Sequence, residues 1–176
     1  PRRDFSSHPW SLSGGGASKL VSTLEERSSK RLGAKLAGKI GFASFPGADE
    51  AFFGPAHHFH NNRIPERLFR PLVLGESVRD WLEIPGEYAF VPYDENAEII
   101  AEDRDSAWYR RMWPYRAIVN NVKGFGGETT GDSGRYWWSW YRWVRARYQA
   151  PLSITFAFVA THSHFVLDRG GKVFKQ

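Results

Sequence analysis

Much of the architecture depends on the stretch Gly134–Tyr148, "GRYWWSWYRWVRARY", which holds four of the chain's eight tryptophans together with four arginines. At about 100° per residue, the pattern predicts a helix with two unequal faces. Its wide face, with Arg147 as the exception, consists of Tyr136, Trp137, Trp140, Tyr141, Trp143, Val144 and Tyr148. A surface helix cannot leave so many apolar side chains in water, so we expect the wide face to lie in the core.

The narrow face of this predicted helix carries Arg135, Trp138, Arg142 and Arg145. Three guanidinium groups around an exposed indole suit a phosphate-bearing polymer. The charges neutralise phosphates in a salt-dependent way, and the ring can stack on a base or wedge between bases. The alternative interpretation is a solvated face that happens to include a tryptophan.

The composition of the chain is typical of one globular domain, or of a domain with an appended element: 176 residues, 41% hydrophobic and 16% aromatic. The absence of cysteine excludes disulfides, cysteine-ligated zinc and thiol nucleophiles, and it fits a cytoplasmic location. No apolar run approaches the roughly 18 residues of a membrane span, and the start does not resemble a signal peptide. The net charge of +5 favours an anionic partner.

The sequence suggests a boundary near residue 33. Residues 1–33 contain a flexible joint, "SGGG" at Ser13–Gly16. Ser22 and Glu25 form the Ser-x-x-Glu pattern of a capping box, which predicts the start of a helix that runs to about Arg31. Residues 34–176 form the main domain. The chain starts without methionine and stops within what resembles a returning strand. We therefore expect a piece of a longer protein, in which residues 1–33 link to the absent part.

Several short elements are predicted in the main domain. Apolar runs bounded by turns predict strands within 39–45, 51–55 and 87–93. Residues 76–82 and 105–113 predict helices, the second stopped by Pro114. Pro151 ends the aromatic helix, and the apolar run 152–167 is then predicted to form a hairpin with "KVFK" across the "DRGG" turn. Helices and short strands mix without regular βαβ alternation, so the predicted class is α+β with a C-terminal β-hairpin.

A second basic aromatic motif is "WYRRMWPYR", Trp108–Arg116. The planar fork of arginine suits phosphate and the acceptor edge of guanine. Alternatively, these arginines pair with the nearby acidic residues Glu102, Asp103 and Asp105. The glycine-rich loop Gly124–Gly134 that follows could order on a ligand, but it does not match the phosphate loop of nucleotide-binding proteins.

Two groups of histidines raise the possibility of a metal or hydrolase site: "HHFH" at 57–60 and "THSH" at 161–164. No acidic residue lies within three positions of either group, and no His-Glu-x-x-His or Gly-x-Ser-x-Gly motif occurs. Hydrogen-bonded structural histidines, or phosphate contacts from His162 and His164, fit better. The acidic run "DENAEIIAEDRD" is more typical of a solvated face than of paired catalytic carboxylates.

Taken together, four segments resemble the C-terminal specificity region of bacterial adenine-specific DNA methyltransferases, above all the PglX-type enzymes of phage-defence systems (BREX and phage growth limitation). They are "GFASFPGADEAFF" (Gly41–Phe53), "RPLVLGESVRDW" (Arg70–Trp81), "RMWPYR" (Arg111–Arg116) and "FVATHSHFVLDRGGKVFK" (Phe158–Lys175). The first two are similar to Taq-type specificity domains, in which a glycine-turn strand precedes Pro-Leu-x-x-Gly-x-x-Ile-x-x-Trp. This chain has Val78 in place of isoleucine and Ser77 where aspartate is expected.

The resemblance implies a role in target recognition. Enzymes of this family transfer a methyl group from S-adenosylmethionine to a flipped adenine, using an Asn-Pro-Pro-Tyr-type motif and a glycine-rich cofactor motif. This chain has neither motif. Residues 34–176 are thus expected to be a DNA-specificity domain without catalytic residues, metal or cofactor. It would hold double-stranded DNA for the catalytic methyltransferase domain of the same parent chain, which binds S-adenosylmethionine.

Composition and position suggest which residues contact DNA. Phosphate contacts are expected from Arg110, Arg111, Lys123, Arg135 and Arg145. We expect base edges to be read by Arg142 and by Asn120 or Asn121, whose amides suit adenine, while Trp138 stacks or wedges.

Two rival functions remain open at this point. In the first, the chain is a protein-interaction module that docks a partner domain through exposed aromatic and arginine residues of Tyr136–Tyr148, because interfaces are enriched in both residue types. In the second, it is a hydrolase that uses His162 or His164 as its base.

Overall fold

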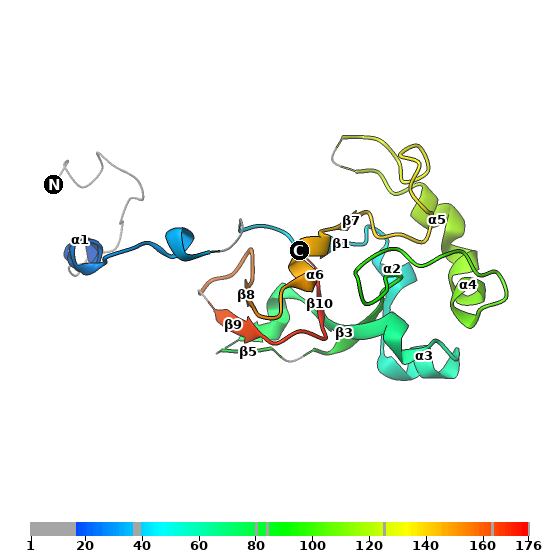
Figure 1. Ribbon diagram of the computed structural model, residues 1–176, viewed down its shortest axis with the longest axis horizontal. Coiled ribbons are helices and arrows are strands. Elements are labelled where there is room, and N and C mark those ends of the chain that lie inside the picture. The colour runs from blue at the N-terminus through cyan, green and yellow to red at the C-terminus, as the bar shows by residue number, and fades with distance from the viewer. Residues whose placement is uncertain are drawn as a thin grey trace. The chain divides into compact units, whose positions relative to one another are not determined.

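The computed structural model describes residues 17–36, 40–79, 81–83, 85–124, 126–162 and 164–175 (Figure 1). The chain separates into two compact units, Pro1–Gly41 and Phe42–Gln176. The predicted joint at Ser13–Gly16 lies outside the described residues. All strands of the described chain belong to the second unit.

The described part of the first unit contains a helix, α1 (Ala17–Arg27), and a 3-10 turn, η2 (Leu32–Lys35). The predicted capping box is wrong, because α1 begins before Ser22, which lies inside the helix. Helix-forming residues on the N-terminal side of Ser22 extend the helix in that direction. Glu25 does not cap; its carboxylate pairs with Arg31 at 2.6 Å.

A four-stranded sheet forms the centre of the second unit, in the order β10–β3–β6–β2. Its strands are β2 (Phe53–Gly54), β3 (Phe69–Val73), β6 (Glu87–Phe90) and β10 (Val173–Phe174). β6 runs antiparallel to both β2 and β3, and β10 runs parallel to β3 with Val173 opposite Leu72. The end of the chain thus completes a sheet that begins near residue 53.

Three further pairs of strands surround this sheet: β1 (Ser44–Phe45) with β7 (Arg142–Trp143), β4 (Val78–Arg79) with β5 (Leu82–Glu83), and β8 (Ser153–Phe156) with β9 (Phe165–Asp168). The helix predicted for residues 76–82 is wrong. A 3-10 turn, η4 (Gly75–Ser77), leads directly into β4. Buried, β-branched Val78 favours the strand, and Trp81 turns the chain with a φ of +70°.

The helices of the second unit are short: α2 (Asp49–Phe52), α3 (Ala56–Asn61), η3 (Glu66–Leu68), α4 (Ala107–Met112), η5 (Trp113–Tyr115), α5 (Arg116–Asn120) and α6 (Arg145–Gln149). Ser106 caps α4, because its hydroxyl accepts the backbone N–H of Tyr109 at 3.2 Å. α4 ends at Met112, next to the stop predicted at Pro114, and the chain continues into η5, where Pro114 lies in the first turn and its N–H is not needed. Among the described residues, no helix has the length and apolar character needed to cross a membrane.

The helix predicted for Gly134–Tyr148 is wrong, because the stretch folds as turns followed by β7 and α6. Three of its indoles donate their N–H groups to backbone carbonyls between residues 90 and 100: Trp138 to Ile100 at 3.3 Å, Trp140 to Phe90 at 3.0 Å and Trp143 to Ala97 at 3.1 Å. A helix would separate Trp138 and Trp140 by about 200°, so both could not face this segment. These three hydrogen bonds therefore favour the observed turns over a continuous helix.

Aromatic rings of Gly134–Tyr148 form much of the core, as predicted, but the set of buried residues differs from the predicted one. Trp137, Trp138 and Trp140 are all buried, whereas Tyr136 is 55% exposed. Trp143 lies between two tyrosines in a parallel stack, with centroid distances of 4.1 Å to Tyr93 and 3.9 Å to Tyr148. Stacked rings of this kind add to the stabilisation that burial alone provides.

The hydroxyl of Tyr148 connects three elements of the second unit. It accepts the backbone N–H of Phe174 in β10 and contacts the Ser44 hydroxyl of β1 at 2.6 Å. The Ser44 hydroxyl donates its one proton to the carbonyl of Phe174, so Tyr148 must be the donor in the pair with Ser44. This closed cycle of hydrogen bonds requires a protonated Tyr148 hydroxyl, and burial raises the pKa of Tyr148 to about 12.

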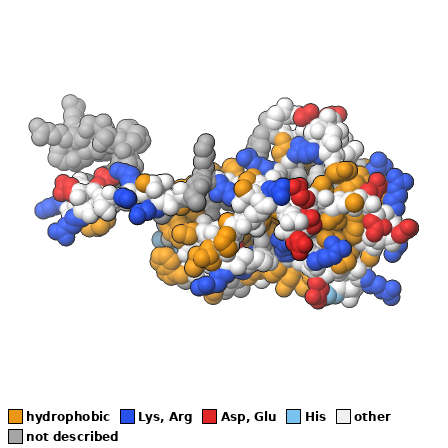
Figure 2. Space-filling model, in the orientation of Figure 1, with side chains coloured by type: hydrophobic (Ala, Val, Ile, Leu, Met, Phe, Trp, Pro, Cys, Tyr) orange, Lys and Arg blue, Asp and Glu red, His pale blue; other side chains and the backbone are white. Residues whose placement is uncertain are grey.

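β8 and β9 form a ribbon with an exposed apolar face. Ile154 lies opposite Leu167 and Phe156 opposite Phe165, and all four side chains are 37–53% exposed. Figure 2 shows hydrophobic side chains gathered in the region of β5, β8 and β9. The predicted α+β class with a C-terminal strand pair is confirmed, but "DRGG" does not fold "KVFK" back onto β9. It leads to β10, because the Val173 side chain is buried beside β3.

Replacing Trp140 with Phe tests the indole bonds. The change removes the N–H that satisfies the Phe90 carbonyl and leaves a void at a 1% exposed position, so we expect a loss of about 2–4 kcal/mol in the free energy of unfolding. Urea denaturation followed by circular dichroism measures this loss. Trp81→Phe, at a 76% exposed position, is the matched control and should change the free energy by less than about 0.5 kcal/mol. Equal losses in both variants would contradict the buried role.

Stability should fall as the pH rises above 10. The pKa of Tyr148 is near 10 in the unfolded chain and about 12 in the folded one, so its contribution is complete below pH 10 and is lost between pH 10 and 12. This amounts to about 1 kcal/mol by pH 11. Burial also raises the pKa of Tyr93, which adds to the effect. Tyr148→Phe should have a lower free energy of unfolding at pH 8 and should lose less of it between pH 8 and 11. If urea denaturation gives the variant and the unaltered chain the same dependence of this free energy on pH, the assignment is refuted.

Candidate nucleic-acid interface

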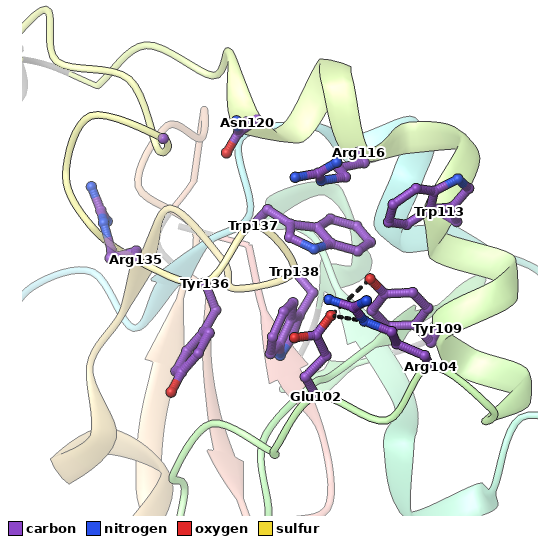
Figure 3. A pocket seen from close by; sticks show the side chains of 11 residues that line it. Glu102, Arg104, Tyr109, Trp113, Arg116, Asn120, Arg135, Tyr136, Trp137 and Trp138 are labelled. Atoms are coloured by element: carbon purple, nitrogen blue, oxygen red, sulfur yellow. Dashed lines mark hydrogen bonds and ion pairs between the residues drawn. The ribbon is translucent and has the colours of Figure 1, made fainter.

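A hollow of about 600 Å³ lies where the helical segment α4–η5–α5 meets the loop before β7 (Figure 3). α4, η5 and α5 supply Tyr109, Trp113, Arg116 and Asn120, the loop before α4 supplies Glu102 and Arg104, and the loop before β7 supplies Gly131, Arg135, Tyr136, Trp137 and Trp138. Three successive segments within residues 102–138 thus line one depression.

The floor of this aromatic–arginine hollow is built from packed rings. Trp137 and Trp138 are buried and meet edge to face, with centroids 5.7 Å apart. Tyr136 stacks on Trp138 at 4.7 Å with 26° between the planes. Because Tyr136 is 55% exposed, it offers its remaining ring surface to a ligand. On the other side, Trp113 is 49% exposed and stacks on Tyr109 at 5.5 Å.

Positive charge exceeds negative charge among the lining residues: three arginines face one carboxylate. Arg104 pairs with Glu102 at 2.9 Å, and the Tyr109 hydroxyl donates to the same carboxylate oxygen (Figure 3). Hydrogen bonds from Arg104 and then from Tyr109 hold the pKa of Glu102 below its usual range. The carboxylate therefore stays ionised and already has partners.

The other two arginines have no carboxylate partner within the described part of the chain. The Arg116 guanidinium lies 5.0 Å from the centroid of Trp113. Arg135 donates to the Ser133 hydroxyl at 2.8 Å and to the Tyr141 carbonyl, and it lies 4.6 Å over the Tyr141 ring. Their charges are held in place by rings and neutral groups, so both remain able to attract an anion.

Asn120 owes its position to a close approach of two segments. The Gly131 backbone N–H donates to the Asn120 carbonyl at 3.0 Å. A β-carbon on Gly131 would lie 3.0 Å from the side-chain amide of Asn120. Gly131 thus gives the loop the room to reach α5 and leaves the amide at the rim of the hollow.

Of the residues predicted to contact DNA, the structure brings Asn120, Arg135 and Trp138 together at this hollow. The predicted exposure of Trp138 is wrong. Its side chain is 2% exposed, because the ring packs beneath Tyr136 and donates to the Ile100 carbonyl. Trp138 can support a stacking platform, but it cannot wedge into DNA from this position.

The neighbouring arginines of α4 lie outside the hollow. Arg111 is half-buried: its guanidinium donates to the Ala51 carbonyl at 2.7 Å and lies 5.0 Å from the Phe59 centroid. Burial lowers its pKa. Arg110 is exposed and donates to the Asp105 carbonyl at 2.6 Å. Arg111 therefore has a packing role, whereas Arg110 remains accessible.

The remaining predicted residues have separate partners. The Asn121 amide donates to the Ala117 carbonyl at 2.8 Å, and Lys123 is exposed and bridges to Thr129 through its backbone. The Arg142 guanidinium lies 5.8 Å from the Phe42 centroid, while Arg145 pairs with Glu98 and donates to the Asn96 carbonyl. Arg142 and Arg145 do not form the predicted stripe with Arg135, because that stripe required a helix.

Eight lining residues were not predicted to contact DNA, among them Arg104, Arg116 and Tyr136. A signal existed for one of them. Arg116 and Asn120 are four residues apart, which places them on one face of a helix. The alternative, in which arginines of Trp108–Arg116 pair with the nearby carboxylates, is not what the described residues show, because Glu102 pairs with Arg104 instead. The exposure of Tyr136 could not be read from a helical pattern that does not form.

The histidines do not gather into a metal site. Within the described ranges, no group of three or more His, Asp or Glu side chains lies close enough to hold an ion. His162 and His164 lie in the run 152–167 that was predicted to form one side of a hairpin, but they belong to the loop between β8 and β9, with ring centroids 6.2 Å apart.

The comparisons with known proteins are consistent with the expected parentage. No family model matches the chain. A segment of an adenine-specific methyltransferase is 35% identical to it over 170 residues, which is 97% of this chain. That protein is PglX of Streptomyces coelicolor, and the chain spans only about 14% of its length.

Proposed function

We propose that this chain is the DNA target-recognition segment of an adenine-specific DNA methyltransferase of a phage-defence system. It would hold double-stranded DNA for a catalytic domain elsewhere in the same polypeptide. The observation that carries the proposal is the aromatic–arginine hollow, supported by the similarity to a segment of PglX. S-adenosylmethionine would bind in the catalytic domain, because this chain lacks the Asn-Pro-Pro-Tyr motif and the glycine-rich cofactor motif of the family.

The chemistry of the hollow suits a nucleic-acid backbone. Two positive charges remain after Arg104 and Glu102 pair, and Arg116 and Arg135 carry them. Guanidinium groups bind phosphate oxygens through a planar fork, and each contact releases counterions from DNA. The side-chain amide of Asn120 has the donor and acceptor that pair with the edge of adenine.

Residues outside the hollow extend the proposed contacts. Arg110, Lys123 and Arg142 are exposed and can reach a polyanion that passes over the domain. Arg111 and Arg145 contribute less in this proposal, because the former packs on Phe59 and the latter pairs with Glu98. Asn121 is assigned to the end of α5, where its amide bonds the helix backbone.

Duplex binding measured by fluorescence anisotropy tests this function. A site with three or four phosphate contacts should lose roughly 40- to 150-fold in affinity between 50 and 200 mM salt. Arg116→Ala combined with Arg135→Ala removes two contacts, so the slope of log affinity against log salt should fall by about 1.8. Arg67→Ala combined with Arg169→Ala removes the same charge from exposed positions outside the hollow and should leave the slope unchanged.

The melting temperature of each double variant separates a binding defect from unfolding. If the chain ignores duplex DNA at 50 mM salt, or if both double variants lower the slope equally, the proposed interface is wrong.

A second candidate function is docking of a protein domain, and the exposed face of the β8–β9 ribbon favours it. Besides the four paired residues, Phe158 is 69% and Val159 80% exposed. No charged residue occurs from Pro151 to His164 apart from the histidines themselves. Exposed apolar surface of this extent is typical of protein contacts. The ribbon is therefore a candidate docking surface besides the predicted Tyr136–Tyr148.

Sedimentation of the chain distinguishes docking from DNA binding. If the ribbon docks protein, the chain should self-associate at high concentration in a manner that rises with salt, and Phe156→Ser combined with Leu167→Ser should abolish this association. Thr155→Ser, on the same ribbon but at a partly buried position, is the control. A monomer at all concentrations, with or without salt, would remove this candidate.

A further inference from the structure

We propose that the exposed face of the β8–β9 ribbon is the docking site of an acidic amphipathic helix that belongs to the remaining part of the same polypeptide. This inference rests on the proposed function in one respect only, because both require the chain to be one segment of a longer protein. It concerns a surface other than the aromatic–arginine hollow, and it gives the ribbon a partner of defined chemistry.

The ribbon has one buried face and one exposed face. Val166 and Asp168 of β9 are each 5% exposed, and Val166 packs with Val73 and Val78. Because side chains alternate along a strand, the residues between them point away from the domain. The ribbon face consists of these outward residues and their cross-strand partners: Ile154, Phe156, Phe165 and Leu167. An apolar sheet face normally packs against another element, and the described part of the chain provides none here.

The neighbouring β4–β5 pair extends the ribbon face on one side. Val78 of β4 shares the buried cluster of Val166, and strands β4 and β9 lie against each other. In the register of β4 and β5, Arg79 lies opposite Leu82, so both side chains point away from that cluster. Leu82 is 57% exposed. The apolar surface thus continues from β9 to β5, where Figure 2 shows hydrophobic side chains gathered.

Positive charge surrounds this surface at three places. Arg79 lies in β4 and Arg169 directly follows β9, and both are exposed. Arg142 lies 5.8 Å from the centroid of Phe42, and the Phe42 ring packs at 5.4 Å on Phe158, beyond the end of β8. Within the described ranges, none of these three arginines has a carboxylate partner. The ribbon face therefore has a basic rim.

The ribbon offers no negative charge to match this rim. No Asp or Glu occurs from Pro151 to Leu167. Asp168 is buried and pairs with Lys172 at 3.1 Å. An apolar surface with a basic rim is complementary to an apolar stripe with acidic flanks. An amphipathic helix that carries Glu or Asp beside its apolar stripe has this chemistry.

The geometry of the ribbon also suits a helix. Ile154 and Phe156 are two residues apart in β8, which corresponds to about 7 Å along the strand. Apolar side chains on successive turns of a helix are about 5.4 Å apart, so they can interdigitate with this row and with its partner row on β9. A helix covers a sheet face, whereas an added strand would pair at an edge and leave the face in water.

The extent of the surface indicates a tethered partner and not a second copy. Its five apolar side chains, 37–57% exposed, offer less than the roughly 800 Å² that each partner buries in a stable complex. A second copy would also bring the same three arginines to the rim, where like charges repel. A helix of the same polypeptide avoids both difficulties, because a tether raises its effective concentration. The similar PglX protein has room for such a helix, since the chain spans only 14% of its length.

Two synthetic helices of opposite charge test the chemistry of the partner. Each has about 15 residues with leucine on one face, flanked by glutamate in one peptide and by lysine in the other. In fluorescence anisotropy at low salt, the glutamate peptide should bind the chain about 10-fold more tightly, and this ratio should fall as salt rises. Equal binding of both peptides, or no binding of the glutamate peptide, would overturn the inference.

A first pair of substitutions tests whether the peptide lies on the ribbon face. Phe156→Ser combined with Leu167→Ser should weaken binding of the glutamate peptide by about 10-fold or more. Both side chains are partly exposed, so the melting temperature should change little. A double variant that keeps its melting temperature and binds the peptide as the unaltered chain does would contradict the site.

A second pair of substitutions tests the basic rim. Arg79→Gln combined with Arg169→Gln should bring the ratio of glutamate to lysine peptide affinity toward one. Arg63→Gln combined with Arg67→Gln removes the same charge from exposed positions after α3 and should leave the ratio unchanged. An equal fall of the ratio in both double variants would show a dependence on net charge alone and would contradict the rim.

Labelling of an introduced thiol tests the source of the partner. The chain contains no cysteine, so a single substitution reports on one position. Ile154→Cys, at a 53% exposed position, should react with a maleimide at least about 10-fold more slowly in the longer protein than in this chain. Arg67→Cys, at an exposed position away from the ribbon, should react equally in both. Equal rates for Ile154→Cys, measured by mass spectrometry, would overturn the inference.

Other occupants of the ribbon face give different results. Protection of Ile154→Cys in this chain alone at micromolar concentration would assign the face to a second copy. Displacement of the glutamate peptide by phosphatidylglycerol vesicles would assign it to a lipid surface, and displacement by duplex DNA would assign it to a nucleic acid. Each of these results would overturn the inference.

Duplex binding separates this inference from the proposed function. Phe156→Ser combined with Leu167→Ser should leave the affinity for duplex DNA unchanged. If the chain ignores duplex DNA but the glutamate peptide and the thiol behave as expected, the proposed function fails and the docking site stands. If duplex DNA binds while the two peptides bind equally, the docking site fails and the proposed function stands.

Discussion

Three indole N–H groups, each bonded to a backbone carbonyl of residues 90–100, hold the second unit in its fold. Trp138, Trp140 and Trp143 donate these bonds, and their rings belong to or pack against one hydrophobic core. Buried N–H and carbonyl groups are costly when unpaired, so the chain must follow a path that satisfies all three pairs at once. The turns, β7 and the start of α6 are the result of that path.

The same constraint explains how far the sequence could predict the structure. The helix predicted for residues 105–113 is present as α4, and the mixture of elements predicted the α+β class. The aromatic stretch predicted a core but not its own conformation, since helical periodicity places Trp138 outside while its hydrogen bond places it inside. Local patterns also could not reveal that Val173 pairs with Leu72, because that pairing joins segments about 100 residues apart.

The sequence predicted the kind of candidate site better than it predicted which residues form the site. Asn120 and Arg135 were expected at a DNA contact, and both line the hollow. Arg116 lies on the same helical face as Asn120, a relation that needs only the four-residue spacing. Arg104 and Tyr136 come from loops whose course depends on the indole bonds. A site assembled from such loops follows from the packing of the core and not from any single motif.

The nature of the three acceptors has a consequence for how this domain can diverge. A backbone carbonyl is present whatever side chain its residue carries, so a position such as Ile100 can change while its bond persists. Only tryptophan offers an indole N–H, so the donors cannot change in the same way. We expect relatives of this chain to keep the tryptophans and to vary freely in the acidic loop opposite them. A search for distant members should therefore weight the spacing of Trp138, Trp140 and Trp143 above the identity of their partners.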